Sequence, residues 1–257
     1  MENHFYSYPD LEGKSVVITG AAKGIGKSIA EAFISNECKV IAMYRSTPPD
    51  FDKAIMKQGP EPDLLKLDIQ DIESAKEWMG CIDDDHQSID VLVNNAGINN
   101  PHELIEVGTD EWDRLFSVNT RATFFLSQLF AKHMSCRNGG VIINATSFAA
   151  KLPSLRYGVY AASKAALLSL TKSMAAEWAE FNIRVNAYSP GVILTDMTSP
   201  TIGKNKDMLL SQISQGAFGM PHDVANSVLF LASNASSYIT GSEIDISGGK
   251  FIVQTAR

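Results

Sequence analysis

The chain has 257 residues, of which 45% are hydrophobic and 20% are charged, a composition typical of a globular protein. Its formal net charge of -7 argues against nucleic acid and against anionic membranes as partners, since both attract basic surfaces. The apolar runs fall short of the ~18 residues that a membrane span needs, and the first residues lack the charged and then apolar pattern of a secretory signal. We therefore expect a cytoplasmic protein that binds neither nucleic acid nor membranes.

The cysteines and histidines indicate neither disulfides nor a metal centre. Cys38, Cys81 and Cys136 are far apart, odd in number and free of any CxxC spacing. The five histidines are scattered and show no HExxH or related spacing. We expect reduced thiols and no catalytic metal.

Short β-branched runs alternate with longer helical patterns along the chain. We predict strands at 15–19, 39–44, 64–67, 90–93, 140–143, 183–188 and 243–246. We predict helices at 26–35, 72–79, 109–133, 160–180 and 221–232. Apolar strands separated by helices indicate a parallel sheet with right-handed crossovers. Because no linker or repeat divides the chain, the predicted fold is a single α/β domain over residues 1–257, a Rossmann-like doubly wound parallel sheet with helices on both faces.

The segment 194–219 interrupts this alternation late in the chain. It is polar and follows a predicted strand, where loops of α/β enzymes often close over a ligand. We expect it to form a substrate lid; a surface excursion without that role is the alternative.

A glycine-rich loop follows the first strand directly. Residues 19–26 read Thr-Gly-Ala-Ala-Lys-Gly-Ile-Gly, with Lys23 and Ile25 between the glycines. Gly20, Gly24 and Gly26 allow a tight turn and close approach to a pyrophosphate, whose charge the free N–H groups of the next helix stabilise. The strand before the loop and the helix after it favour a dinucleotide site over a simple turn.

The end of the second strand predicts which dinucleotide binds. An acidic residue there would hold the ribose 2′-hydroxyl of NAD, whereas a basic residue suits a 2′-phosphate. The chain has Arg45 at this place, no carboxylate beside it, and Lys23 in the glycine loop. We predict NADP(H) as the preferred cofactor and keep NAD(H) as the alternative, in which both cations are solvated surface charges. Asp68, after the third strand, is a candidate acceptor for the adenine amino group or a cap of the next helix.

A tyrosine and a lysine open the helix predicted at 160–180. Tyr160 and Lys164 are four residues apart, so they share one helical face. An ammonium favours the phenolate and lowers the phenol pKa, which brings Tyr160 toward the range useful for acid–base catalysis. Ser147, at the end of an earlier strand, offers a hydroxyl that could orient a substrate oxygen.

These residues together resemble the short-chain dehydrogenase/reductase family over nearly the whole chain. Residues 19–26 resemble its cofactor loop, and Asn-Asn-Ala-Gly at 94–97 resembles its NNAG motif. Asn119, Ser147, Tyr160 and Lys164 match the order and separation of its catalytic tetrad. The segment 189–195 resembles the Pro-Gly segment that meets the nicotinamide carboxamide.

The resemblance implies a role for each position of the tetrad. Tyr160 transfers the proton, Ser147 binds the substrate oxygen, and Lys164 lowers the phenol pKa and holds the nicotinamide ribose. Asn119 supports a water of a proton relay, with a helix kink or backbone cap as the alternative. The cofactor residues expected from the loop and the resemblance are Gly20, Lys23, Gly24, Ile25, Gly26, Arg45, Asp68, Ile69, Asn95, Ala96, Gly97, Tyr160, Lys164, Pro190, Gly191, Ile193 and Thr195.

Three functions remain open at this stage. The first is an NADP(H)-dependent carbonyl reductase similar to 3-oxoacyl reductases, and the second is a sugar or polyol dehydrogenase, because residues 8–27 resemble bacterial glucose dehydrogenases. The third, a non-catalytic cofactor-binding scaffold, is disfavoured by the intact tetrad. An apolar wall is suggested by Phe148, Ala149, Leu152, Pro153 and Tyr157, and hydroxyl or carboxylate binding by Asn99, Asn100, His102 and Arg156.

The helix predicted at 160–180 carries more apolar surface than one sheet face needs, and relatives in the family pair this helix. We therefore expect a symmetric homo-oligomer, a homotetramer, acting on a small-molecule carbonyl or alcohol. The basic residues that carrier-protein reductases often place on two neighbouring helices are incomplete here. Arg137 matches one, but Ala176 and Glu177 stand at the second place. Docking of an acyl carrier protein is thus left in doubt.

Overall fold

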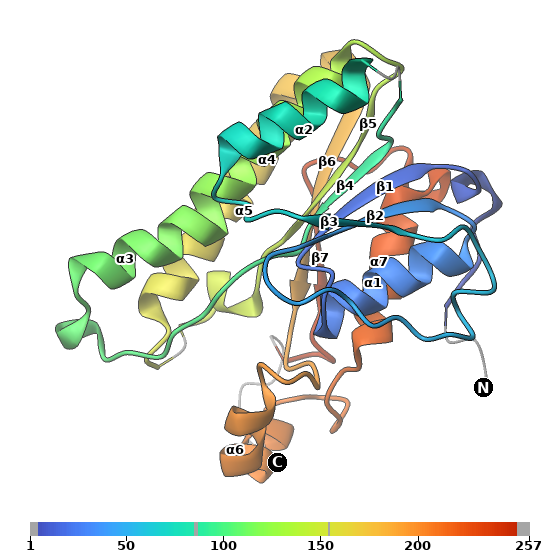
Figure 1. Cartoon of the computed structure of the whole chain (residues 1–257). Helices are drawn as coiled ribbons and strands as arrows, with labels where there is room; N and C mark the ends of the chain where they lie inside the picture. The colour runs from blue at the N-terminus through green and yellow to red at the C-terminus, as the bar shows by residue number, and fades with distance from the viewer. Residues whose placement is uncertain (1–4, 85–86, 154, 251–257) are drawn as a thin grey trace.

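Seven parallel strands form one sheet in the order β3-β2-β1-β4-β5-β6-β7 (Figure 1). The computed structural model describes residues 5–84, 87–153 and 155–250. Every predicted strand is present, although β3 and β4 are displaced by one residue because the neighbouring strand sets their register. The strands are β1 (Ser15–Thr19), β2 (Lys39–Tyr44), β3 (Asp63–Lys66), β4 (Val91–Asn94), β5 (Gly140–Ala145), β6 (Ile183–Pro190) and β7 (Glu243–Ile246).

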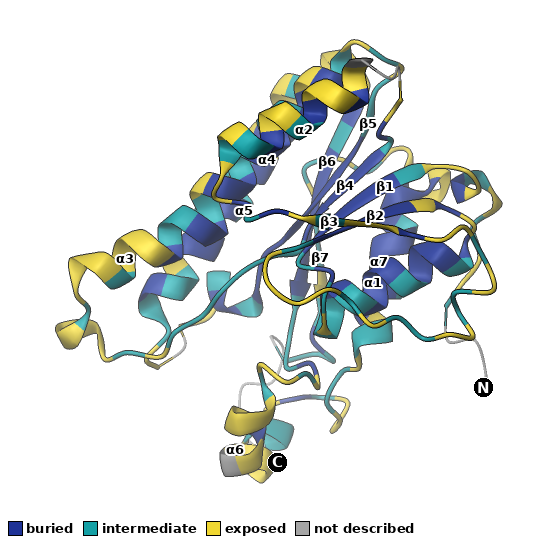
Figure 2. Cartoon of the chain, viewed as in Figure 1, coloured by how far each residue is buried: buried dark blue, intermediate teal, exposed yellow. Residues whose placement is uncertain are grey.

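Helices cover both faces of the sheet, as the doubly wound prediction requires (Figures 1 and 2). α1 (Gly24–Ser35) and α7 (Pro221–Ala232) share one core layer with Val16 and Ile18 of β1. Val17 points to the other layer, which α2 (Ile72–Asp84), α4 (Thr123–Ser135) and α5 (Gly158–Trp178) complete. Apolar side chains on both faces explain why the central strands read as continuous β-branched runs.

The strand order reverses between β1 and β4, and this reversal places the site. Both strands are buried, and β1 pairs with β2 on one side and β4 on the other. The connections after β1 and β4 therefore leave the sheet in opposite directions and open a crevice at their carboxyl ends. The glycine loop after β1 and the Asn-Asn-Ala-Gly segment after β4 meet there.

The single helix predicted at 109–133 is wrong in one respect. The structure has α3 (Thr109–Phe116), a π-helical segment (Ser117–Ala122) and then α4. The extra residue in the turn aims Asn119 at the chain following β4, a tertiary contact that apolar periodicity does not encode. The helix predicted at 160–180 also ends earlier, at Trp178, because a short 3-10 helix (Ala179–Phe181) follows it.

The segment 194–219 carries one exposed helix, α6 (Ser199–Ser211), below the carboxyl ends of the strands (Figures 1 and 2). Its two ends are closed by a bridge between Ile193 and Gly219, where the Leu194 N–H donates to the Gly219 carbonyl over 2.9 Å. Backbone hydrogen bonds therefore hold the two ends of the segment together beside the end of β6.

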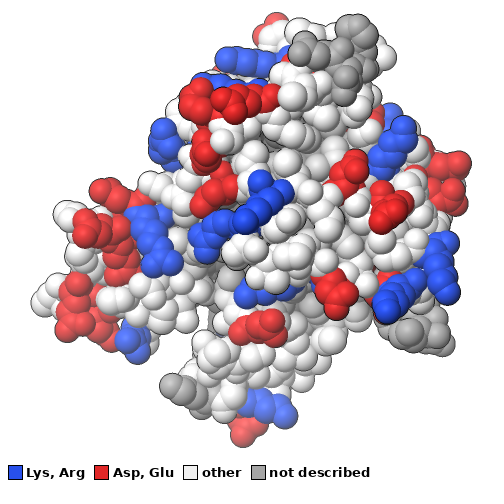
Figure 3. All heavy atoms as spheres, viewed as in Figure 1, with Lys and Arg blue, Asp and Glu red and all other residues white. Residues whose placement is uncertain are grey.

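The described residues contain no helix that is long and apolar enough to cross a membrane. On the face in Figure 3, basic and acidic side chains are interspersed over the surface. Cys38, Cys81 and Cys136 are free thiols, and residues 5–84, 87–153 and 155–250 contain no group of three or more His, Cys, Asp or Glu that could hold a metal.

Candidate active site

Tyr160 and Ser147 meet at the carboxyl end of β5. Tyr160 lies in the first turn of α5, and Ser147 is buried two residues after β5, where its hydroxyl accepts from the Ala149 N–H over 3.2 Å. Burial raises the pKa of Tyr160, while a hydrogen bond with Ser147 lowers it and the nearby Tyr157 raises it. The phenol is therefore held in its protonated form, ready to act as an acid.

Lys164 is buried one helical turn further along α5. Its ammonium donates to the Ala145 carbonyl over 2.7 Å, and burial lowers its pKa to about 8. The net direction at Tyr160 is upward, because desolvation outweighs the bond from Ser147, and the lowering of its pKa by Lys164 stays a prediction. The Lys164 ammonium interacts with the carbonyl that ends β5.

Asn119 is fully buried in the π-helical segment and clamps the chain after β4. Its Oδ1 accepts from the Ile98 N–H over 2.9 Å, and its Nδ2 donates to the Ile98 carbonyl over 2.9 Å and to Ser163 Oγ over 3.1 Å. The side chain thus caps backbone, the alternative named for this residue. Its support of a relay water stays a prediction.

Gly97 shows how closely the tetrad converges. A Cβ atom at this position would lie 3.2 Å from Nζ of Lys164 and 3.3 Å from Oδ1 of Asn119. Any side chain there would press on both groups, so the chain after β4, the π-helical segment and α5 meet at one point. The four residues of the tetrad, which are separated in sequence, therefore lie in one cluster.

The glycine loop makes a tight turn in which side chains at two of its glycines would collide with the backbone or with Asn95. Gly20 and Gly24 have positive φ values of 66° and 57°, and a Cβ at Gly26 would lie 2.2 Å from the Gly20 carbonyl oxygen. Thr19 Oγ1 accepts from the N–H groups of Asn95 and Ala96, both over 3.0 Å. The free N–H groups at the start of α1 therefore face a loop that is fixed from two strands.

The two predicted phosphate-binding cations are accessible. Lys23, the N-cap residue of α1, and Arg45, directly after β2, are exposed, and neither has an ion pair within the described part of the chain. Asp68 Oδ1 accepts from the Gln70 N–H over 3.0 Å, so it stabilises the turn after β3, and Ile69 beside it is buried. The contact of Asp68 with adenine stays a prediction.

The Pro-Gly segment begins at the last residue of β6 and packs against the turn after β7. A Cβ at Gly191 would lie 2.7 Å from the Ser247 Cα, so Pro190 and Gly191 pack on the C-terminal turn. Ile193 is buried, and the Thr195 methyl would be 3.4 Å from a Cβ at Gly24. Segments about 170 positions apart in sequence, at Gly24 and Thr195, thus lie side by side.

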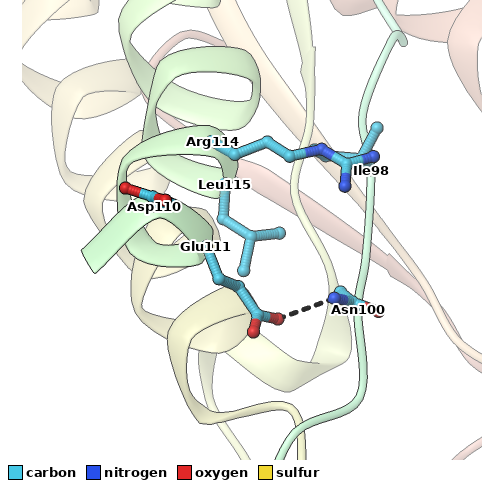
Figure 4. A pocket seen from close by; sticks show the side chains of 6 residues that line it. All are labelled: Ile98, Asn100, Asp110, Glu111, Arg114 and Leu115. Carbon is cyan, nitrogen blue, oxygen red and sulfur yellow. Dashed lines mark hydrogen bonds between the residues drawn. The ribbon is translucent and has the colours of Figure 1, made fainter. Parts of the chain in front are cut away.

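A cavity of about 210 Å³ lies between the chain after β4 and α3 (Figure 4). Asn100 donates to Glu111 over 2.8 Å across it, and His102 lies 3.3 Å from the same carboxylate. Arg156 pairs with Glu103 over 3.3 Å. These three candidates for binding substrate hydroxyls are already held by carboxylates of the chain. The cavity residues are Ile98, Asn100, Asp110, Glu111, Arg114 and Leu115.

Sequence reasoning missed two groups beside the tetrad. Tyr188 is fully buried in β6, and its hydroxyl donates to Asn95. In the sequence this tyrosine stands within a predicted strand, where nothing indicates a contact with Asn95. The Glu243 carboxylate of β7 accepts from the hydroxyl of Thr146, the residue before Ser147, and pairs with the Lys151 ammonium. A charged residue in a short predicted strand was the available signal for Glu243.

The fold and the tetrad define an oxidoreductase that acts on alcohol or carbonyl groups, and the chain belongs to the short-chain dehydrogenase/reductase family. A family model described as enoyl-(acyl carrier protein) reductase matches residues 20–250. The relatives identify the type more closely. The 3-oxoacyl-[acyl-carrier-protein] reductase FabG of Thermotoga maritima is 39% identical over 94% of this chain and 99% of its own, and that of Chlamydia pneumoniae is 36% identical over 93% and 97%.

Solved structures of the family confirm the fold and bring in sugar dehydrogenases. A protein of Beutenbergia cavernae described as an NAD(P)-dependent gluconate 5-dehydrogenase, with bound NADP, superposes with a TM-score of 0.87 at 30% identity over 95% of this chain and 99% of its own. The aldohexose dehydrogenase of Thermoplasma acidophilum gives 0.86 at 30% identity over 97% and 100%. The chain is thus an oxidoreductase most like the 3-oxoacyl reductases, with sugar dehydrogenases as structural neighbours.

Proposed function

We propose that the protein reduces the ketone of 3-oxoacyl thioesters or esters with NADPH as its preferred cofactor. The observation that carries the proposal is the apolar rim, defined as the exposed apolar side chains of residues 104–105, of the loop before α5 and of segment 194–219. Ile105 and Leu155 are 95% and 93% exposed, and Met197 is 54% exposed. Exposing such side chains around a catalytic mouth is favourable when an apolar substrate covers them. The rim consists of Leu104, Ile105, Leu152, Leu155, Leu194, Met197 and Met208.

Three of the four polar candidates for substrate binding already have partners within the chain. A sugar dehydrogenase needs free donors and acceptors for several hydroxyls, but Asn100 and His102 bind Glu111, and Arg156 binds Glu103. Breaking these contacts to bind a sugar would cost part of the gain. The sugar or polyol dehydrogenase remains the second candidate because it is supported by the relatives described as gluconate and aldohexose dehydrogenases.

The chemistry follows from where each group lies. The reduced nicotinamide supplies a hydride to the ketone carbon when the cofactor is bound. The Ser147 hydroxyl binds the ketone oxygen, and the protonated Tyr160 gives its proton to that oxygen as negative charge develops. Lys164, anchored at the Ala145 carbonyl, orients the cofactor ribose and returns a proton to the phenolate. Segment 194–219 acts as the lid that excludes water from the site.

We also propose the domain organisation, the assembly, the location and the cofactor site of the protein. We infer one domain over residues 1–257, a cytoplasmic homotetramer, and cofactor binding by the glycine loop, Lys23 and Arg45. NADP bound in the Beutenbergia cavernae relative and in an Agrobacterium tumefaciens relative supports this cofactor choice.

The test compares substrate classes under matched conditions. The kcat/KM for acetoacetyl-coenzyme A with NADPH is measured beside oxidation of glucose and gluconate with NADP+. We expect reduction of the thioester to exceed either sugar oxidation by at least about a hundredfold, since a sugar would have to displace three polar contacts at about 1 kcal/mol each. A higher kcat/KM for glucose or gluconate would replace the proposal with the sugar dehydrogenase.

A further inference from the structure

Lys250 places an ammonium between the segment after Ser147 and the end of α6. Its Nζ lies 5.4 Å from the ring centroid of Phe148, the residue after the catalytic Ser147. The same Nζ donates to Gln212 Oε1 at the end of α6 over 2.7 Å. Its backbone belongs to the turn whose Ser247 packs against Gly191. The ammonium therefore lies between Phe148 and the end of α6, and the turn that carries it packs on the segment expected to meet the nicotinamide.

Among the residues that the structure describes, none places an opposite charge beside this ammonium. Within residues 5–84, 87–153 and 155–250, no carboxylate lies within ion-pair distance of Lys250, and its partners are a neutral amide and a ring face. The contrast with Lys151 is direct, because that lysine pairs with the nearly buried Glu243. Burial lowers the pKa of Lys250, a sign that its charge is incompletely solvated. A partly buried cation without a counter-charge is stabilised by an anion.

We propose that Lys250 is an anion-binding subsite and that the favoured substrate carries a carboxylate or a phosphate on the same molecule as its ketone. The inference rests on the reductase function proposed above and narrows its substrate class. The anion would replace the Gln212 amide or join it at Nζ, which has three donor positions. A carboxylate near the ketone and a phosphate on the arm of a thioester are the two sources of this chemistry.

A structural reading of Lys250 makes a different prediction. If the residue only ties α6 to Phe148, its loss affects every substrate alike, charged or neutral. If it binds an anion, its loss affects only the charged member of a matched pair. Pairs that share one reacting group therefore separate the two readings.

The experiment measures kcat/KM with NADPH for two such pairs. Acetoacetate is paired with ethyl acetoacetate, and acetoacetyl-coenzyme A is paired with acetoacetyl-N-acetylcysteamine, which lacks the phosphates. The variants are Lys250→Met, Lys250→Arg and, as a control at the amino end of β2, Lys39→Met. We expect Lys250→Met to lower kcat/KM about tenfold to a hundredfold for the charged member of one pair and less than about twofold for its neutral partner. Lys250→Arg retains most of the activity, and Lys39→Met changes nothing.

The pair that responds identifies the source, carboxylate or phosphate. Equal losses in both members, or none in either, overturn the subsite. If the wild type reduces none of the four compounds, the 3-oxoacyl proposal fails by itself, and the comparison moves to oxidation of gluconate against glucose. Binding is followed independently of turnover, as the rise in Tm that acetoacetate or inorganic phosphate gives in the presence of NADPH. A rise that is the same in wild type and Lys250→Met also overturns the subsite.

Discussion

The hydroxyl of Tyr188 donates a 3.0 Å hydrogen bond to Oδ1 of Asn95 and so connects β6 with the chain after β4, across the end of β5. The same Asn95 side chain also binds the glycine loop, because its Nδ2 donates to the carbonyls of Thr19 and Gly20 over 3.0 and 3.2 Å. A Cβ at Gly26 would lie only 2.4 Å from that nitrogen. Tyr188 therefore fixes the orientation of the amide against which the glycine loop rests.

We predict that Tyr188→Phe weakens NADPH binding more than it slows the reaction. The variant leaves Asn95 Oδ1 without its donor, which costs about 1–3 kcal/mol in stability and loosens the loop. We expect the NADPH Kd to rise about fivefold or more, with kcat within about threefold of wild type. Fluorescence titration gives the Kd, and Tyr238→Phe, at a fully exposed tyrosine, is the control. An unchanged Kd with a lowered Tm would make Tyr188 a packing residue alone.

The second prediction concerns the proton donor. Tyr160→Phe removes the hydroxyl that the structure keeps protonated beside Ser147. We expect kcat to fall by about 10²–10⁴, the usual contribution of a general acid, while NADPH still binds. Steady-state kinetics and a fluorescence titration on the same preparation separate the two effects. Turnover within about tenfold of wild type would remove Tyr160 from the role of acid.

The third prediction is a pH dependence of stability that originates at Lys164. Burial lowers its pKa from 10.5 to about 8 in the folded protein. Between these values the unfolded chain binds more protons than the folded one, so this group makes folding more favourable as pH rises from about 8 to 10.5. Lys164→Met removes the effect. Relative to this variant, the wild type should gain stability with rising pH, on the order of 3 kcal/mol over the full range.

Urea unfolding of both proteins without cofactor at pH 7, 8, 9 and 10 measures this difference. Groups common to both proteins cancel in the comparison. A stability difference that stays constant across the series would mean that Lys164 titrates normally. A difference that moves against the wild type would place a counter-charge near it.

The sheet and the tetrad were predictable from sequence because both depend on local signals. The apolar run at Val16, Val17 and Ile18 predicts a strand covered on both faces, and the spacing of Tyr160 and Lys164 places them on one face of a helix. Contacts between distant segments were not predictable. The hydrogen bonds between Asn119 and Ile98 accompany a π-helical segment within the helix predicted at 109–133, whereas the apolar periodicity of the sequence continues through it.

The same limit applies to the mouth of the site. The sequence suggested Asn99, Asn100, His102 and Arg156 as substrate ligands, but carboxylates of the chain bind the last three. Only the folded chain shows which polar groups are already paired. It also shows Lys250, whose position after the paired glycines carries no local signal, beside Phe148.

The fourth prediction concerns assembly. Leu167 and Met174 of α5 are buried against the sheet, whereas Leu170 and Trp178 are partly exposed on the same helix. Covering such apolar surface favours symmetric association. Light scattering at micromolar concentration should give four times the mass of one 28.0 kDa chain. A monomer at this concentration would contradict the homotetramer.

The last prediction is the choice between NADPH and NADH. Lys23 and Arg45 come from different loops, are exposed, and have no ion pair within the described residues. A 2′-phosphate would bond to both, and charge-assisted bonds are about twice as strong as neutral ones. NADH would leave both cations hydrated, so the binding free energy that it loses relative to NADPH is moderate. If each contact favours the phosphate by about 1.5 kcal/mol, the preference for NADPH is roughly a hundredfold in kcat/KM.

Substitution at the end of β2 should reverse that preference. In the double variant Tyr44→Asp with Arg45→Ala, a carboxylate repels the 2′-phosphate and accepts from the ribose hydroxyls of NADH. The measurement is kcat/KM for both cofactors on the wild type, the double variant and Lys39→Met, whose lysine lies at the opposite end of β2. We expect the ratio to pass from about a hundredfold in favour of NADPH to a preference for NADH, with the control unchanged. A wild-type enzyme that prefers NADH would show that Arg45 serves only as a solvated surface charge, and the end of β2 would then have no part in selecting the cofactor.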